Sequence, residues 1–115
     1  MINSHNEANF IEVIDGVEVK STVYGEKSIM SKFRMRSGHK LPSHNHPDYE
    51  QTGYLLEGYI VLSIGGTATE MRPGDSWCIG CGVEHSAEII EDSVALEVFT
   101  YPREDYVKLL DPESR

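Results

Sequence analysis

Short runs rich in Val, Ile, Tyr, Phe and Thr alternate with glycine-containing turns along most of this chain. The runs recur at a spacing of about 8–12 residues, which is typical of an all-β sandwich or barrel. One later segment, 103–110, follows Pro102 and has the apolar spacing of a short amphipathic helix. Strands are predicted over residues 10–14, 17–24, 28–36, 49–57, 59–65, 67–72, 76–79, 85–91 and 94–101. The pattern therefore predicts an all-β fold with a short C-terminal helix.

Alternation along the last predicted strand separates two faces of different character. One face carries Ala95, Glu97, Phe99 and Tyr101, and the other carries Val94, Leu96, Val98 and Thr100. Successive side chains of a strand point to opposite faces. If the face with Glu97 lines a cavity, the more apolar face with Val94, Leu96 and Val98 must therefore point outward. That face then needs cover from a facing sheet or a second subunit. A homodimer is therefore one expectation from this strand.

Length and charge restrict the class of protein. The chain has 115 residues, a length typical of one domain, and residues 1–115 are expected to form it. Its 19 acidic and 10 basic residues give a net charge of −9, which argues against nucleic acid, whose binding depends on Lys and Arg. No apolar run approaches the roughly 18 residues of a membrane span, and no signal peptide is visible. A cytoplasmic protein with no membrane partner is expected.

Four side chains that commonly bind metals stand in a compact arrangement. The pattern is His44-x-His46-x4-Gln51, and His85 follows on a distant predicted strand. Residues two apart on a strand share a face, so both histidines of the pair can approach one ion. Imidazole nitrogens and a side-chain oxygen suit one divalent transition metal such as nickel, zinc, iron, manganese or cobalt, and leave room for substrate. Two alternatives stay open: a chance histidine pair on an exposed strand, and Glu50 as the ligand in place of Gln51.

Two other clusters have less specific interpretations. Cys78 and Cys81 form a C-x-x-C without a second pair, so two packed thiols are favoured over a redox or metal role. The basic residues Lys32, Arg34, Arg36 and Lys40 lie close together in the sequence. Their alternation with Phe33 and Met35 indicates an outer sheet face that balances the acids, or else a rim that attracts anions.

The histidines belong to a larger pattern of glycines. Gly38-x5-His44-x-His46-x4-Gln51-x6-Gly58 resembles the first motif of the cupin superfamily, and Gly74-x5-Gly80-x-Gly82-x2-His85 resembles the second. The resemblance covers about residues 28–101. It implies a small antiparallel jelly-roll barrel with the metal inside one mouth, and many cupins form dimers.

Three positions depart from the usual cupin motifs. Gly80 stands where proline is usual, Ile89 where asparagine is usual, and Gln51 where glutamate is usual. The last departure bears on chemistry, because a neutral ligand set leaves a bound ion with its full positive charge.

Two segments, 44–58 and 96–105, resemble a narrower group. They are similar to the KdgF-type cupins, which linearise 4,5-unsaturated monouronates released from pectin and alginate. The resemblance implies that His44, His46, Gln51 and His85 bind the metal. It also implies functional roles for Glu97, where the group has aspartate, and for Phe99 and Arg103. In the mechanism we expect, Glu97 and Arg103 act in catalysis, Arg103 pairs with the carboxylate of a carboxylated sugar, and Phe99 and Tyr101 form a wall for its ring.

Other functions are compatible with the same residues. A mononuclear site of this kind also supports dioxygenases or lyases that act on small chelating substrates, and a metabolite-binding cupin without turnover is a third hypothesis. The proposed catalytic residues have structural alternatives too. Glu97 would then pair with Arg34 or Arg36, and Arg103 would pair with Glu104 or Asp105 at the surface.

Overall fold

The computed structural model describes residues 1–115 and is built almost wholly of antiparallel strands. The elements are β1 (Ile11–Ile14), β2 (Val17–Tyr24), β3 (Ile29–Met35), β4 (Lys40–His44), β5 (Gln51–Ile64), β6 (Thr67–Met71), β7 (Ser76–Ile79), β8 (His85–Phe99) and α1 (Glu104–Val107). The prediction of an all-β fold with one short C-terminal helix is confirmed. The helix is far too short to cross a membrane.

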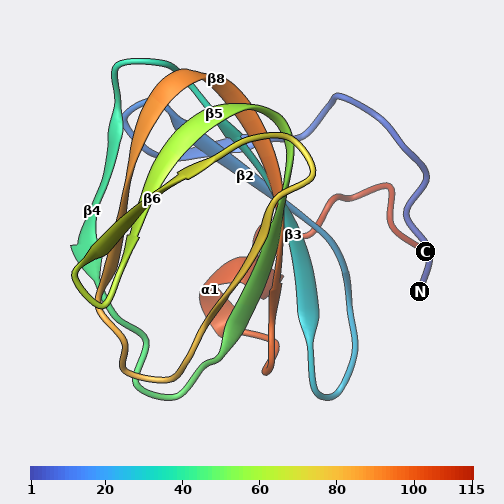
Figure 1. The fold of residues 1–115 in the computed structure, drawn as a ribbon. Helices are drawn as coiled ribbons and strands as arrows, with labels where there is room; N and C mark the ends of the chain where they lie inside the picture. The colour runs from blue at the N-terminus through green and yellow to red at the C-terminus, as the bar shows by residue number, and fades with distance from the viewer.

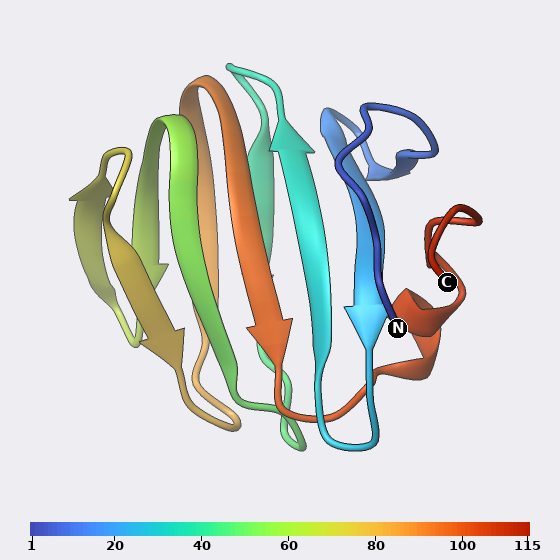
Figure 2. The same ribbon diagram turned by 90° about the vertical axis from the view of Figure 1, so that its right-hand side faces the viewer.

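Two long strands connect the whole sheet. The main path runs β1-β2-β3-β8-β5-β6, while β4 pairs with β8 and β7 pairs with β5. Because β5 and β8 have 14 and 15 residues, each takes one partner along its first half and another along its second. The sheet therefore curls on itself, as Figure 1 shows, and Figure 2 shows α1 beside the ends of β2 and β3. This is the jelly-roll that the motifs imply.

The predicted breaks inside β5 and β8 are wrong. The segments 49–57 and 59–65 form one strand, and so do 85–91 and 94–101. Gly58 has a positive φ of 95°, and a Cβ there would lie 2.2 Å from the Oγ atom of Ser93. The register of β5 against β8 shifts around this point, so the glycine marks a bulge that bends two paired strands.

The pattern also fails to predict β4, which carries the first histidine of the pair. Pro42 lies in the middle of this strand, and a proline lacks the N–H group that a central strand donates. The structure resolves the conflict because β4 pairs only with β8 and so lies at an edge. The predicted helix at 103–110 is shorter as well, since Leu110 forms a bridge with Ser21 instead.

The alternation of β8 places its faces as predicted. Ala95 and Phe99 are each 1% exposed and belong to the interior, whereas Val94, Leu96 and Val98 on the other face are partly exposed. The homodimer that would cover this outer face stays a prediction.

The basic cluster lies outside the barrel. Arg34 donates to Glu18 at 2.8 Å, Arg36 lies 3.8 Å from Glu18, and Lys40 lies 3.7 Å from Glu88. The interpretation as an outer face that balances acids therefore holds, and the alternative pairing of Glu97 with Arg34 or Arg36 is wrong.

A buried ion pair fastens the two ends of the chain to the outer side of β2. Lys20 and Asp111 are 1% and 0% exposed, and their charged atoms lie 3.3 Å apart. Asp111 also accepts hydrogen bonds from the side-chain amides of Asn3, Asn6 and Asn9. These bonds, that from Asn6 first, hold the pKa of Asp111 well below its usual range. No sequence pattern indicates this cluster, because isolated charged residues are usually exposed.

We expect Asp111→Ala to lower the free energy of unfolding at pH 7 by about 3 kcal/mol, since it leaves the Lys20 ammonium buried without its counterion. A lowered carboxyl pKa stabilises the fold above the unfolded value of about 3.9 and loses that effect as the pH falls below it. The variant should therefore lose part of the acid sensitivity between about pH 4 and pH 2. Urea unfolding across this range tests both points.

Glu88→Ala, which breaks the exposed pair with Lys40, is the control and should lower the free energy of unfolding by at most about 0.5 kcal/mol. Equal losses in the two variants would contradict the interpretation.

Candidate metal centre

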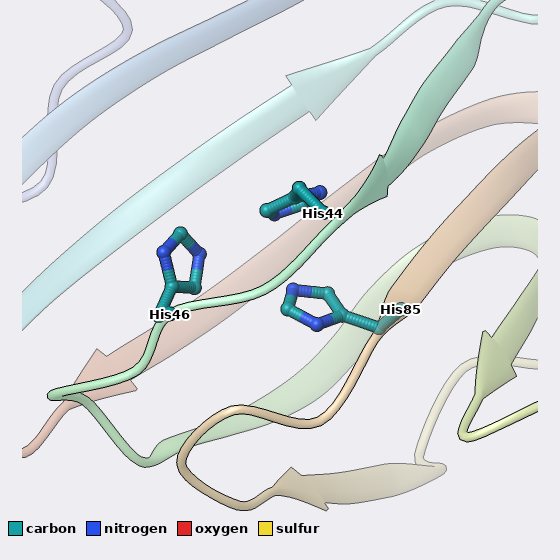
Figure 3. Close-up of side chains that lie close together, drawn as sticks. All are labelled: His44, His46 and His85. Atoms are coloured by element: carbon teal, nitrogen blue, oxygen red, sulfur yellow. The ribbon is translucent and has the colours of Figure 1, made fainter.

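Three histidines from separate parts of the chain meet at one end of the barrel. His44 is the last residue of β4, His85 is the first of β8, and the two are paired in register. His46 follows β4 in a loop, so it does not share the strand face that its spacing predicts. Figure 3 shows the three rings gathered around one point, and their ligand atoms all lie within 4.8 Å of one another. The chance-pair alternative is thereby disfavoured.

Backbone carbonyls fix the protonation of two of these rings. The Nδ1 atom of His85 lies 2.9 Å from the carbonyl of Val83, and that of His44 lies 2.8 Å from the carbonyl of Pro42. A carbonyl can only accept, so Nδ1 carries the proton in both rings and Nε2 keeps its lone pair. Metal-binding histidines are commonly oriented in this way.

One of these lone pairs has no partner in the protein. The Nε2 atom of His85 is buried and accepts no hydrogen bond. Buried polar atoms are nearly always satisfied, so this atom indicates an absent ligand. A divalent cation bound by the three imidazoles would be the missing partner of this nitrogen atom, so the donor set fits such an ion.

The surroundings also keep these histidines in their metal-binding state. Burial, followed by the positive charge of Arg103, lowers the pKa of His46 to about 4. Burial lowers the pKa of His85 as well. Both rings are therefore neutral at physiological pH, and only the neutral imidazole binds a metal.

Gln51 lies on the wall of the same cavity, at the start of β5. It is 6% exposed, and its amide nitrogen donates to the Oε2 atom of Glu97 at 2.8 Å. The amide oxygen is then left for a cation, which suits the predicted fourth ligand. Glu50 is exposed and does not line the cavity, so the alternative ligand is disfavoured.

Glu97 is held among donors inside the barrel. Its Oε1 atom accepts a hydrogen bond of 3.2 Å from the indole of Trp77, and its Oε2 atom accepts the one from Gln51. Burial raises the pKa of Glu97 to about 7, against the opposing effects of these two hydrogen bonds and of Arg103. A carboxyl group with such a pKa can both accept and donate a proton near neutral pH.

Arg103 is buried among aromatic rings at the N-terminus of α1. Its guanidinium lies 3.9 Å from the ring centre of Tyr106 and 4.8 Å from that of Phe99. It donates to both carboxylate oxygens of Asp105, at 3.1 and 2.6 Å. The pairing with Asp105 is therefore present, although Arg103 is buried and also lines the cavity.

The two aromatic residues predicted as a sugar wall lie in different surroundings. Phe99 is 1% exposed, lines the cavity and lies edge-on to His46 with ring centres 6.2 Å apart. Tyr101 is 60% exposed and does not line the cavity, so the structure does not bring it to the site. Tyr106, which sequence reasoning passed over, lines the cavity instead.

The cavity that connects these groups is small. Its volume is about 70 Å³, and apolar residues make up 11 of the 18 that line it. Roughly 10–15 Å³ of such space holds one water molecule, so the cavity takes an ion and several small groups. Cys78 and Cys81 are exposed free thiols, so the prediction of two packed thiols is wrong, and neither of them lines this cavity.

Comparisons with known proteins agree with this architecture. KdgF from Halomonas sp. has a TM-score of 0.87 at 22% identity, with 91% of this chain and 96% of that one covered. An RmlC-like cupin from Shewanella frigidimarina NCIMB 400 has a TM-score of 0.85 at 19% identity, with coverage of 91% and 94%. Salicylate 1,2-dioxygenase from Pseudoaminobacter salicylatoxidans has a TM-score of 0.72 at 16% identity, with coverage of 85% and 28%. At these identities the likeness establishes the fold alone.

No curated protein matches the chain by sequence. A family model described as a cupin domain matches residues 31–101, close to the predicted core of 28–101. The match contains the three histidines and Gln51, and it covers more than half of the chain. The chain therefore belongs to the cupin family.

Proposed function

We propose that this cupin is a metal-dependent enzyme that linearises a small unsaturated sugar acid, with a 4,5-unsaturated monouronate as substrate. The observation that carries the proposal is the position of Glu97. It is a half-buried carboxyl group whose pKa desolvation raises to about 7, and it lines the same cavity as the three histidines and Gln51. The similarity of segments 44–58 and 96–105 to the KdgF-type cupins names the substrate class.

The metal centre in this proposal consists of His44, His46, His85 and Gln51. A divalent ion bound there supplies a Lewis acid, which polarises an oxygen of the substrate and lowers the pKa of its hydroxyl group. All four side chains are neutral, so they leave the positive charge uncompensated inside a protein of net charge −9. That charge favours an anionic substrate.

Glu97 moves the proton during ring opening. In its ionised form it takes the proton from the hydroxyl on C1, C1 becomes a carbonyl carbon, and the bond between C1 and the ring oxygen breaks. The electron pair passes to the ring oxygen and yields an enolate across C4 and C5. Glu97 then returns the proton to C4, which leaves a linear keto acid and the carboxylate restored. The reaction is an isomerisation and needs no oxidant or further reactant.

Arg103 and its aromatic neighbours hold the acid end of the substrate. Asp105 accepts hydrogen bonds from the Nε and Nη2 atoms of Arg103, and the guanidinium in the cavity wall would also donate to a substrate carboxylate. Because the cavity has a volume of only about 70 Å³, it accommodates the reacting edge of the sugar. The remainder of the ring lies at the mouth in this proposal, beside Tyr106.

Proton NMR of a freshly generated 4,5-unsaturated monouronate tests the proposal. The vinyl proton on C4 should disappear faster with metal-loaded protein than in buffer alone, and EDTA-treated protein should restore the spontaneous rate. Loss at the spontaneous rate in every sample would contradict the proposal. Oxygen uptake on chelating enols by the iron-loaded protein would then favour a dioxygenase, and tight binding without product would favour a metabolite-binding cupin.

A further inference from the structure

Trp77 and Glu97 lie on the two strands that flank β5, and the residue of β5 between them is a glycine. Gly53 of β5 pairs with Trp77 of β7 on one side and with Glu97 of β8 on the other. The three residues therefore form one row across the sheet. The indole nitrogen of Trp77 nevertheless lies 3.2 Å from the Oε1 atom of Glu97, so the ring spans the width of the strand between them.

The glycine is required for this contact. A Cβ at Gly53 would lie 2.2–2.4 Å from three atoms of the Trp77 ring, far inside any tolerated separation. The backbone of Gly53 does not have a positive φ, so the conformation of the chain does not demand a glycine there. The space is instead occupied by an indole that is 9% exposed.

The hydrogen bond from Trp77 determines which carboxylate oxygen of Glu97 is left to accept a hydrogen bond from Gln51. With Oε1 engaged by the indole, Oε2 accepts from the amide nitrogen of Gln51 at 2.8 Å. An amide group has a donating and an accepting end, and a carboxylate can only accept. The pairing therefore directs the nitrogen of Gln51 toward Glu97 and leaves its oxygen as the end that can bind a cation.

We propose that Trp77, Gly53 and Glu97 form a relay that orients the amide of Gln51 as a metal ligand. Trp77 also lines the cavity, but it offers no metal ligand, and in this proposal it is a positioning residue that acts on the ion through Glu97. The inference rests on the metal centre of the proposed function, but it does not depend on which substrate is converted. Outer partners of this kind commonly change metal affinity by about 10- to 100-fold.

Cobalt titration of the metal-stripped protein tests the relay without any substrate. Trp77→Phe keeps an aromatic ring and removes the N–H donor, so the Kd for Co²⁺ should rise by about 10-fold. The visible d–d bands of bound Co²⁺ should change as well, because they report the coordination geometry. Gly53→Ala should shift both readouts in the same direction, since the added methyl group displaces the indole while Trp77, Glu97 and Gln51 are unaltered. Thermal unfolding of each variant confirms that it is folded.

Two controls separate the relay from a general effect of the substitutions. Tyr59→Phe also removes a donor to a glutamate, Glu70, but at an exposed site, and should leave the Kd unchanged. In a Glu97→Gln background, Trp77→Phe should change the Kd by less than about twofold, because the relay is already broken.

A Trp77→Phe variant with the Kd and spectrum of the wild type would overturn the proposal. So would an equal effect of Trp77→Phe in the wild-type and Glu97→Gln backgrounds. If the wild-type protein binds no Co²⁺, the metal centre and the relay are both wrong. A failed uronate assay alongside the expected cobalt results would overturn only the proposed reaction.

Discussion

His85→Ala is expected to remove both metal binding and catalysis while leaving the barrel folded. His85 is 6% exposed, and its Nε2 atom is the buried polar atom that has no partner in the protein. Loss of a direct ligand should lower metal affinity by more than the roughly 100-fold that loss of an outer partner can cost. Elemental analysis of the purified variant should show less metal than wild type, and the vinyl proton should decay at the spontaneous rate.

His5→Ala is the matched control, because His5 is an exposed histidine outside the cluster, with its Nε2 atom 3.1 Å from Glu7. It should retain wild-type metal content and rate. Full metal content in His85→Ala would contradict the placement of the ion among the three histidines.

Glu97→Gln is expected to lower kcat by about 10²- to 10⁴-fold, the usual contribution of a general acid or base. The metal should remain bound, with a Kd raised by about 10- to 100-fold at most, because the substitution breaks the relay to Gln51 but leaves the ligands themselves in place. Steady-state rates from the NMR assay and a metal titration separate the two effects. Glu88→Gln, an exposed glutamate in the ion pair with Lys40, should have the wild-type rate.

The pH profile provides a second test of Glu97. The base must be ionised to accept the first proton, so the rate should fall as the pH drops through the pKa of this carboxyl group. Burial raises that pKa to about 7, and the positive charge of a bound ion opposes the rise. The acid limb should therefore lie at or below about pH 7 and should be missing in Glu97→Gln. An unchanged limb in the variant would assign the titration to another group.

The features that sequence reasoning recovered are those encoded by local patterns. Alternation along 94–101 predicted the interior position of Glu97 and Phe99, because side-chain direction in a strand has a period of two. The spacing of His44, His46 and His85 within the cupin motifs predicted a cluster that the structure brings together. The role of Gln51 as a ligand stays a prediction that the geometry supports.

The features that sequence reasoning missed depend on contacts between residues that are distant in the sequence. The relay from Trp77 requires the register of β7, β5 and β8, which no single segment contains. The buried pair of Lys20 and Asp111 requires both ends of the chain to meet on β2. The break predicted between 49–57 and 59–65 coincides with Gly58, whose positive φ belongs to a bulge inside one strand, because a bulge and a turn can both require this conformation.

The most direct test of the account is the location of the metal. Crystals of the nickel-loaded protein, measured at the nickel absorption edge, should show one anomalous peak per chain. The peak should lie about 2 Å from an imidazole nitrogen of His44, His46 and His85, with an oxygen of Gln51 completing the set. A peak at any other place, or none among the three histidines, would contradict the central claim.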